Sequence, residues 1–222
     1  MGRLETMATK GKVGILGSGS VGQQLGQGFA KHGFSVLVGS RDPAKLHSWK
    51  LSTTGDIHVG SFEEAARFGE VLVLATSGAG TEEALDLAGP ENFANKLVLD
   101  ATNPLDFSRG MPPGLLVGTT DSLGERVQRR LPKAKVVKCF NSMSNTRMVD
   151  PQFGQGAPPM FICGNDEAAK QRATEIIREF GWPGTLDVGG IDAARWLEAL
   201  VPLWVRVGQR LGTFDHAFSV VR

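Results

Sequence analysis

The sequence predicts an α/β protein built on a doubly wound, mainly parallel sheet. Short apolar runs alternate with amphipathic stretches along most of the 222 residues. Strands that are regularly separated by helices form parallel sheets with helices on both faces. Some of the runs are apolar throughout, which is typical of strands covered on both faces. At about 150 residues per domain, this length indicates one large domain, or one domain with a smaller second lobe.

The first half of the chain predicts five strands with helices between them. Lys12–Leu16, with the sequence KVGIL, is a short apolar run that ends in glycines, which indicates a buried strand. In Ser20–Lys31 the apolar residues recur at every fourth position, so they lie on one face of a helix. Ser61, with Glu64 three residues later, is a capping-box pattern that begins a helix. The other strands are expected over 34–39, 57–59, 71–76 and 96–102, and the other helices over 43–50, 61–68 and 81–88.

The second half continues the alternation after an irregular loop. The loop 103–118 contains three prolines and is expected to have no regular structure. A seventh strand, 159–164, is expected to join the same sheet. The chain is expected to end in a long apolar helix over 191–211. The remaining predicted elements are helices over 121–131 and 166–180, and strands over 134–140 and 185–188.

A change of composition near residue 145 predicts a domain boundary. There the chain becomes rich in Gly, Pro, Ser and Asn, in the stretch NSMSNTRMVDPQFGQGAPP. We therefore expect a first domain over 11–145 and a smaller C-terminal lobe over 146–222 that contains the long apolar helix. Residues 1–6 precede a second methionine, Met7, and are left out of the predicted fold.

Charge and composition argue against several classes of function. The 24 Lys+Arg and 23 Asp+Glu residues give a formal net charge of +1. This balance lacks the excess of positive charge that is typical of proteins that bind nucleic acid or a membrane surface. No run approaches the ~18–20 apolar residues of a membrane span, and the N-terminus lacks the apolar core of a signal peptide. The two cysteines form neither a disulfide scaffold nor a zinc motif. We expect a cytoplasmic protein without a metal site.

A glycine-rich turn connects the first strand to the first helix. Its first glycine permits the tight turn, its second lets the backbone approach a pyrophosphate, and its third lets helix and strand pack closely. The free N–H groups of the helix N-terminus favour an anion there. Because the motif lies between a strand and a helix, it predicts a Rossmann-type dinucleotide site, and the alternative is a turn without function. The six residues are Gly17, Ser18, Gly19, Ser20, Val21 and Gly22.

The end of the second strand predicts which dinucleotide binds. Sites for NAD usually carry Asp or Glu there to bind the ribose 2′-OH, but this chain has Ser40 and Arg41, with Lys45 one helical turn later. An arginine fork, a lysine charge and a hydroxyl donor together suit a 2′-phosphate. The sequence therefore predicts NADP(H), and the alternative is that Arg41 and Lys45 are solvated surface charges. We interpret Asp42 as a helix cap rather than a ribose ligand.

Four segments of the chain stand out together: VGILGSGSVGQQL, VLVGSRDPAK, VLDATNPL and LEALVPLWVRVGQRLG. They resemble the coenzyme F-420-dependent NADP oxidoreductases and the related cytosolic domain of the Steap ferric reductases. The resemblance covers nearly the whole chain from Lys12, and the motif Leu-Glu-x-Leu-x-Pro-Leu in the last helix is its most specific part. It implies a small-molecule redox acceptor, coenzyme F-420, FMN or FAD, stacked on the nicotinamide and covered by the C-terminal lobe. It also implies a homodimer through the last helix.

The resemblance also implies contacts at three loops that follow later strands. Thr76 and Ser77 would lie near the nicotinamide ribose, and Asn103 and Pro104 would lie at the same edge of the sheet. The residues that would face the second ring are Phe140, Asn141, Ser142 and Met143. The loop TSGAG after the fourth strand has no aromatic residue, unlike the deazaflavin enzymes, so the identity of the acceptor stays open.

The sequence predicts no catalytic side chain. Hydride transfer between two rings needs alignment and exclusion of water rather than an acid or base. None of the four histidines has an obvious carboxylate partner, and 191–211 contain no lysine of the kind that hydroxyacid dehydrogenases use. We interpret Lys138 as a surface or structural residue and Cys139 as a buried, inert thiol. Two alternatives stay open: an NADPH-dependent reductase of a small carbonyl or imine, and a non-catalytic NADP(H) sensor.

Overall fold

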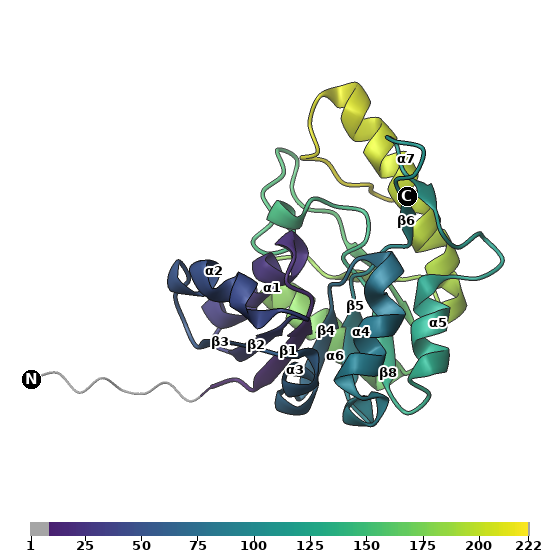
Figure 1. The fold of residues 1–222 in the computed structure, drawn as a ribbon. Helices are drawn as coiled ribbons and strands as arrows, with labels where there is room; N and C mark the ends of the chain where they lie inside the picture. The colour runs from purple at the N-terminus through teal and green to yellow at the C-terminus, as the bar shows by residue number, and fades with distance from the viewer. Residues whose placement is uncertain (1–8, 222) are drawn as a thin grey trace, which may run out of the picture.

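The predicted strands form one eight-stranded sheet in the computed structural model, which describes residues 9–221 (Figure 1). The strands of this sheet are β1 Lys12–Leu16, β2 Ser35–Gly39, β3 Ile57–Gly60, β4 Val71–Leu74, β5 Leu97–Asp100, β8 Lys135–Lys138, β9 Met160–Gly164 and β10 Thr185–Asp187. Their order across the sheet is β10-β9-β8-β5-β4-β1-β2-β3. The chain therefore builds one half outward from β1 to β3 and then returns to build the other half from β4. Ligands of such folds bind at the carboxyl ends of the strands where the order reverses, which here lies between β1 and β4.

The sheet is mainly parallel, as predicted, with one exception. Strands β1 to β5 and β8 are parallel. Strand β9 joins the edge of β8 in the antiparallel direction, with Val137 opposite Gly164, and β10 pairs parallel with β9. The seventh predicted strand thus belongs to the same sheet, as expected.

Helices cover both faces of the sheet. Their bounds are α1 Ser20–Lys31, α2 His47–Leu51, α3 Phe62–Phe68, α4 Thr81–Ala88, α5 Leu123–Arg130, α6 Glu167–Glu179 and α7 Ala194–Leu211. The short 3-10 turns are η1 Pro43–Leu46, η2 Gly78–Gly80, η3 Pro90–Phe93, η4 Asn145–Arg147 and η5 Ile191–Ala193. One apolar core unites the sheet with α1 and α6, and a second unites its other face with α3, α4, α5 and the start of α7. Both faces of the strands are therefore buried, which explains their continuous apolar runs.

Local signals place several element ends correctly. The capping box at α3 is present, because Ser61 Oγ accepts a hydrogen bond from Glu64 N and Glu64 Oε2 accepts one from Ser61 N. Asp42 is the N-cap residue of η1, as predicted, but its side chain makes no capping hydrogen bond within the described residues. Its carboxylate instead lies 3.7 Å from Lys45 Nζ.

The loop 103–118 is not wholly irregular. Within it, β6 Leu105–Asp106 pairs antiparallel with β7 Gly114–Leu115 to form a small hairpin. Two residue pairs hold this hairpin, and seven residues separate its strands, so it has no local turn signal of the two-residue kind.

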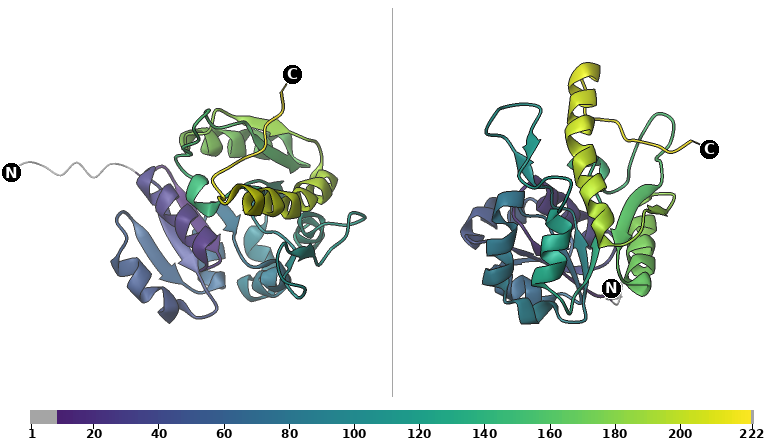
Figure 2. Two further views of the ribbon diagram at one scale, coloured as in Figure 1. Left: turned by 90° about the horizontal axis from the view of Figure 1, so that it is seen from above. Right: turned by 90° about the vertical axis from the view of Figure 1, so that its right-hand side faces the viewer.

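The last helix and the segment after it lie at one end of the molecule. Helix α7 continues through Pro202 and ends at Leu211, and the next residue, Gly212, has a φ of 69° that reverses the chain. The following segment, 213–221, turns back at the end of α7 and then leads away from the helix (Figure 2). There His216 stacks on Trp204 with ring centroids 5.0 Å apart, and Trp204 Nε1 donates to His216 O at 3.0 Å. Within the described residues, no helix is both long and apolar enough to cross a membrane.

Candidate functional site

The glycine turn after β1 has the close packing that its motif predicts. Gly17 has a φ of 136°, and a Cβ there would lie 2.3 Å from the carbonyl oxygen of Ala75. A Cβ on Gly22 would lie 1.9 Å from the carbonyl oxygen of Gly17, so the helix packs directly on the turn. Gly19 is different, because a Cβ there would meet no atom of the described part of the chain within 4 Å. It precedes α1 and leaves the N–H groups of the first turn without a side-chain cap.

A cleft opens beside this turn at the carboxyl edge of the sheet, where the strand order reverses. It is lined by Gly17, Ser18, Gly19, Ser40, Arg41, Asp42, Lys45, Phe62, Ala75, Thr76, Ser77 and Gly80. Eight of these are residues that the sequence singled out as cofactor ligands. The cleft also includes Phe62, Ala75 and Gly80, which sequence reasoning missed. Phe62 is the first residue of α3, and its apolar side chain gave no sign that it faces a cleft rather than the core.

The rim of the cleft near β2 carries the positive charges. Ser40 is buried, with its Oγ donating to Ser18 Oγ at 3.1 Å and accepting from the N–H of Asp42 at 3.1 Å. Arg41 is exposed, and its Nη1 lies 3.1 Å from Glu83 Oε2 on α4. Such exposed ion pairs contribute about 0.2–1 kcal/mol, so an arriving phosphate competes easily for the guanidinium. The arrangement suits an anion held between Ser40, Arg41 and Lys45.

The loop after β4 forms the opposite wall of the cleft. Thr76 Oγ1 lies 2.9 Å from Thr81 Oγ1, and Thr81 Oγ1 donates to the carbonyl oxygen of Ser77 at 3.1 Å. A Cβ on Gly78 would lie 2.3 Å from the carbonyl oxygen of Asn103, so this loop touches the loop after β5.

Six of the predicted residues do not line this cleft. Ser20 and Val21 begin α1 behind the turn, and Gly22 packs against it. Asn103 and Pro104 lie one loop further along the sheet edge, after β5. Asn141, which follows β8, lines a different cavity.

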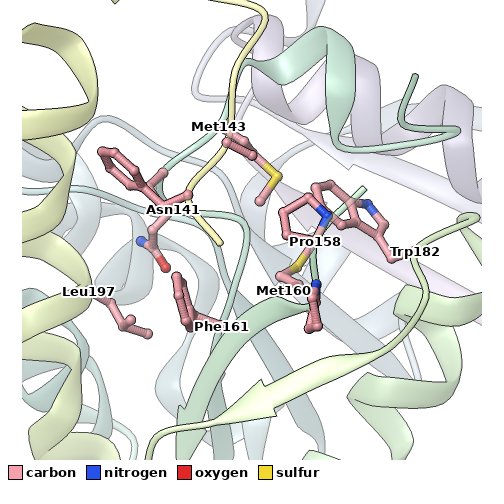
Figure 3. Close-up of a pocket in the computed structure, with 11 residues that line it drawn as sticks. Asn141, Met143, Pro158, Met160, Phe161, Trp182 and Leu197 are labelled. Atoms are coloured by element: carbon pink, nitrogen blue, oxygen red, sulfur yellow. The ribbon is translucent and has the colours of Figure 1, made fainter. Parts of the chain in front are cut away.

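This second cavity lies between the loop after β8, the start of β9, helix α7 and the segment after α7 (Figure 3). It is lined by Asn141, Ser142, Met143, Pro158, Pro159, Met160, Phe161, Trp182, Leu197, Ala217 and Phe218. None of these side chains is ionisable. Three of the four residues expected to face a second ring are among them. The fourth, Phe140, is buried in the core with a φ of 62°.

The Asn141 amide is a buried polar group in this wall, with 8% of the residue exposed. Its Nδ2 donates to the carbonyl oxygen of Thr102 at 3.1 Å and to Asn103 Oδ1 at 2.8 Å. Its Oδ1 has no hydrogen-bond partner among residues 9–221. A buried acceptor left unpaired costs about 1–3 kcal/mol.

Beneath this loop lies a buried ion network that sequence reasoning missed. Lys138 is fully buried, so of the two roles expected for it the structural one is confirmed and the surface one is wrong. Its Nζ lies 3.0 Å from Asp100 Oδ2 and 2.8 Å from Glu198 Oε1, and it donates to the carbonyl oxygen of Thr102 at 2.7 Å. Burial alone would lower the pKa of Lys138, but the two carboxylates raise that pKa overall. The signal that could have revealed this network is the presence of a charged residue inside each of three apolar segments of the sequence.

Glu198 extends this network to the neighbouring helix. Its two carboxylate oxygens accept hydrogen bonds from the N–H groups of Leu123 and Gly124, each at 2.9 Å, at the start of α5. A carboxylate at a helix N-terminus is favoured by the free N–H groups and the helix dipole. The most specific motif of the last helix therefore connects α7 to α5 and the sheet.

Both cysteines are buried thiols. Burial raises the pKa of Cys139 well above its ordinary value, and it raises the pKa of Cys163 to about 12. The thiolate is the reactive form, so neither residue is poised for redox chemistry. The expectation of a buried Cys139 is confirmed.

Comparisons with known proteins agree on one family. Residues 12–104 match the family model described as NADP oxidoreductase, coenzyme F420-dependent. A crystal structure of a protein assigned as an F420-dependent NADP-reductase from Arthrobacter sp. FB24 is 40% identical and covers 96% of this chain and 100% of that one, with a TM-score of 0.92. The F420-dependent NADP reductase of Methanocaldococcus jannaschii is 28% identical over 87% of this chain and 91% of its own length.

A second group of relatives is longer than this chain. Metalloreductase STEAP3 of Rattus norvegicus is 32% identical over 95% of this chain, but the match covers 42% of that protein. The chain thus spans about two fifths of the length of that relative. An imine reductase from Aspergillus terreus shares the fold, with a TM-score of 0.64 at 19% identity.

Proposed function

The chain belongs to the family of coenzyme F420-dependent NADP oxidoreductases, and we propose that it transfers hydride between NADP(H) and a flavin or deazaflavin. The observation that carries this proposal is the cleft beside the glycine turn. All of its lining residues lie between Gly17 and Gly80, inside the segment that matches the family model. The cleft combines a phosphate-binding helix start with a cationic rim at the end of β2, the two features that NADP(H) requires.

Each part of the cleft has a role in this proposal. The turn around Gly19 and the first N–H groups of α1 bind the pyrophosphate. Ser40, Arg41 and Lys45 bind the 2′-phosphate, which NADH lacks. The loop with Thr76 holds the nicotinamide ribose, so the dinucleotide extends along the carboxyl edge of the sheet toward β5 and β8. When bound in its reduced form, NADPH would supply the hydride.

The second cavity is the proposed site of the acceptor. It follows β8 at the same sheet edge, and Met143, Met160 and Trp182 give it the apolar and aromatic walls that suit a planar ring. As it stands it contains about 20 Å³ of space, enough for a water molecule but not for a ring. The segment with Ala217 and Phe218 borders the cavity and would have to move to admit one.

The lining of this cavity favours ring-to-ring hydride transfer over reduction of a small carbonyl or imine. Reducing a carbonyl or an imine requires a proton in addition to the hydride, usually from a positioned side chain. None of the described residues that line the cavity is ionisable. A flavin or deazaflavin can take its remaining proton from solvent after the hydride has arrived.

The experiment that tests this function is oxidation of NADPH by the purified protein in the presence of coenzyme F420, FMN, FAD or a ferric chelate. NADH serves as the control donor. We expect turnover with a flavin or deazaflavin and a clear preference for NADPH. Tight binding of NADPH without turnover of any acceptor would contradict the proposal and favour a nucleotide sensor.

A further inference from the structure

The orientation of the Asn141 amide is fixed by its neighbours. Its Nδ2 donates to two oxygens, the main-chain carbonyl of Thr102 and the side-chain carbonyl of Asn103. Turning the amide over would place its oxygen against the Thr102 carbonyl, which cannot donate a hydrogen bond. The Asn103 Nδ2 in turn donates to the carbonyl oxygen of Asn141. The Oδ1 of Asn141 must therefore point away from this pair of bonds.

That oxygen lies on the cavity side of the loop. In Figure 3 it points toward Phe161 and Leu197, which line the cavity and have no polar side-chain atom. No group among residues 9–221 donates to it. Buried polar atoms in folded proteins are almost always paired, so an unpaired one at a cavity wall marks the place of a ligand group. The missing group is a hydrogen-bond donor.

The Asn141 side chain is also held in place by a buried network beneath its loop. The Thr102 carbonyl that anchors Asn141 accepts a second bond, from the fully buried Lys138 at 2.7 Å. Lys138 is itself held by Asp100 and Glu198, on two different elements. A polar group fixed by such supporting contacts is preorganised for one ligand geometry.

We propose that Asn141 Oδ1 accepts a hydrogen bond from an N–H group on the edge of the hydride acceptor, and that it selects planar acceptors that carry this donor. The inference rests on the proposed function. The imide N–H of a flavin or deazaflavin, which lies between two carbonyl groups, is a donor of this kind. Asn141 is thus a specificity-determining residue, while the ring itself is held by the apolar walls.

The test compares two acceptors that differ only at this donor, lumiflavin and 3-methyl-lumiflavin, on the wild-type protein and on Asn141→Leu. We expect the wild type to prefer lumiflavin about tenfold in kcat/KM with NADPH, the value of one neutral hydrogen bond. In Asn141→Leu the ratio falls toward one. Bulk added by the methyl group acts on both proteins, so the change in the ratio isolates the hydrogen bond. Asn145→Leu makes the same change four residues further along the chain, at a residue that does not line the cavity, and keeps the wild-type ratio.

Binding of both flavins, measured by quenching of their fluorescence, gives the same comparison independently of turnover. An equal ratio in the wild type and in Asn141→Leu overturns the assignment, even when both rates fall, because Asn141 would then only support its loop. A wild type that binds neither flavin also overturns it. Selective binding without hydride transfer from NADPH contradicts the proposed function but supports the role of Asn141.

Discussion

Arg41 occupies the position where sites for NAD carry a carboxylate, and we expect this residue to determine the choice of nucleotide. Arg41→Ala should weaken NADPH binding about 10- to 100-fold, because a hydrogen bond between two charged groups contributes about 1.5–3 kcal/mol. NADH lacks the 2′-phosphate, so its affinity should stay nearly unchanged. Titration of both nucleotides by calorimetry measures the two effects.

Glu83→Gln is the matched control for Arg41→Ala. It removes the carboxylate that lies 3.1 Å from the Arg41 guanidinium and leaves the guanidinium in place. NADPH binding should stay as tight as in the wild type or become tighter, because the phosphate no longer competes with Glu83. If Arg41→Ala loses affinity for NADPH and NADH equally, the 2′-phosphate does not bind at this position.

Two glycines of the same turn should respond in opposite ways. Gly19→Val should keep the melting temperature, because a Cβ there meets no atom within 4 Å, yet it should abolish binding of both nucleotides by filling the cleft. Gly22→Ala should lower the melting temperature, because its Cβ would lie 1.9 Å from the Gly17 carbonyl oxygen. Thermal unfolding and nucleotide titration of both variants separate the two effects. Normal NADPH binding by Gly19→Val would mean that the pyrophosphate lies elsewhere.

At the scale of single residues, the sequence predicts the role of a residue well when residues close to it in the chain determine that role. The glycine turn and the Ser40, Arg41 and Lys45 group each lie within a few residues, so spacing alone brings them together. Lys138 is the opposite case. Its partners Asp100 and Glu198 lie 38 and 60 positions away, so its burial depends on how β5, β8 and α7 come together. For the same reason, no local pattern marks the unpaired oxygen of Asn141.

At the scale of elements, the Lys138 network joins β5, β8, α5 and α7. Lys138→Met should reduce the free energy of unfolding by about 3–5 kcal/mol, because the carboxylates of Asp100 and Glu198 stay buried without their countercharge. Urea unfolding followed by circular dichroism measures this. Lys135→Met, on the same strand with a partly exposed side chain, is the control and should change stability by less than about 1 kcal/mol. Equal stability of the two variants would mean that the network does not hold α7 to the sheet.

The elements that the sequence predicts well are those with their own local signals. Strand β1, helix α1 and the capping box of α3 follow from apolar periodicity and cap residues. The direction of β9 does not follow from such signals, because an apolar run forms a parallel or an antiparallel strand equally well. The path of the chain between β8 and β9 determines that direction. The β6–β7 hairpin depends on two residue pairs inside a proline-containing loop, and its short strands carry too few residues for a pattern.

At the scale of the whole molecule, α7 has two apolar faces, and residues 9–221 cover only one of them. Val201, Trp204 and Val205 pack against the segment after the helix. On the other side Trp196, Leu203 and Leu211 are 63%, 53% and 59% exposed. At about 100° per residue these three side chains lie on one side of the helix. Exposed apolar patches of this kind mark interaction surfaces in soluble proteins.

We propose that this face of α7 is the contact of a homodimer, and we expect the protein to sediment as a dimer at micromolar concentration. Leu203→Glu should give a monomer, because it places a charge in the centre of the apolar stripe and burying an unpaired charge is costly. Gln209→Glu, on another side of the same helix, adds the same charge and should stay dimeric. Sedimentation velocity of the wild type and the two variants measures their oligomeric state, and NADPH binding shows that each protein is folded. A dimer that survives Leu203→Glu would place the interface on another surface.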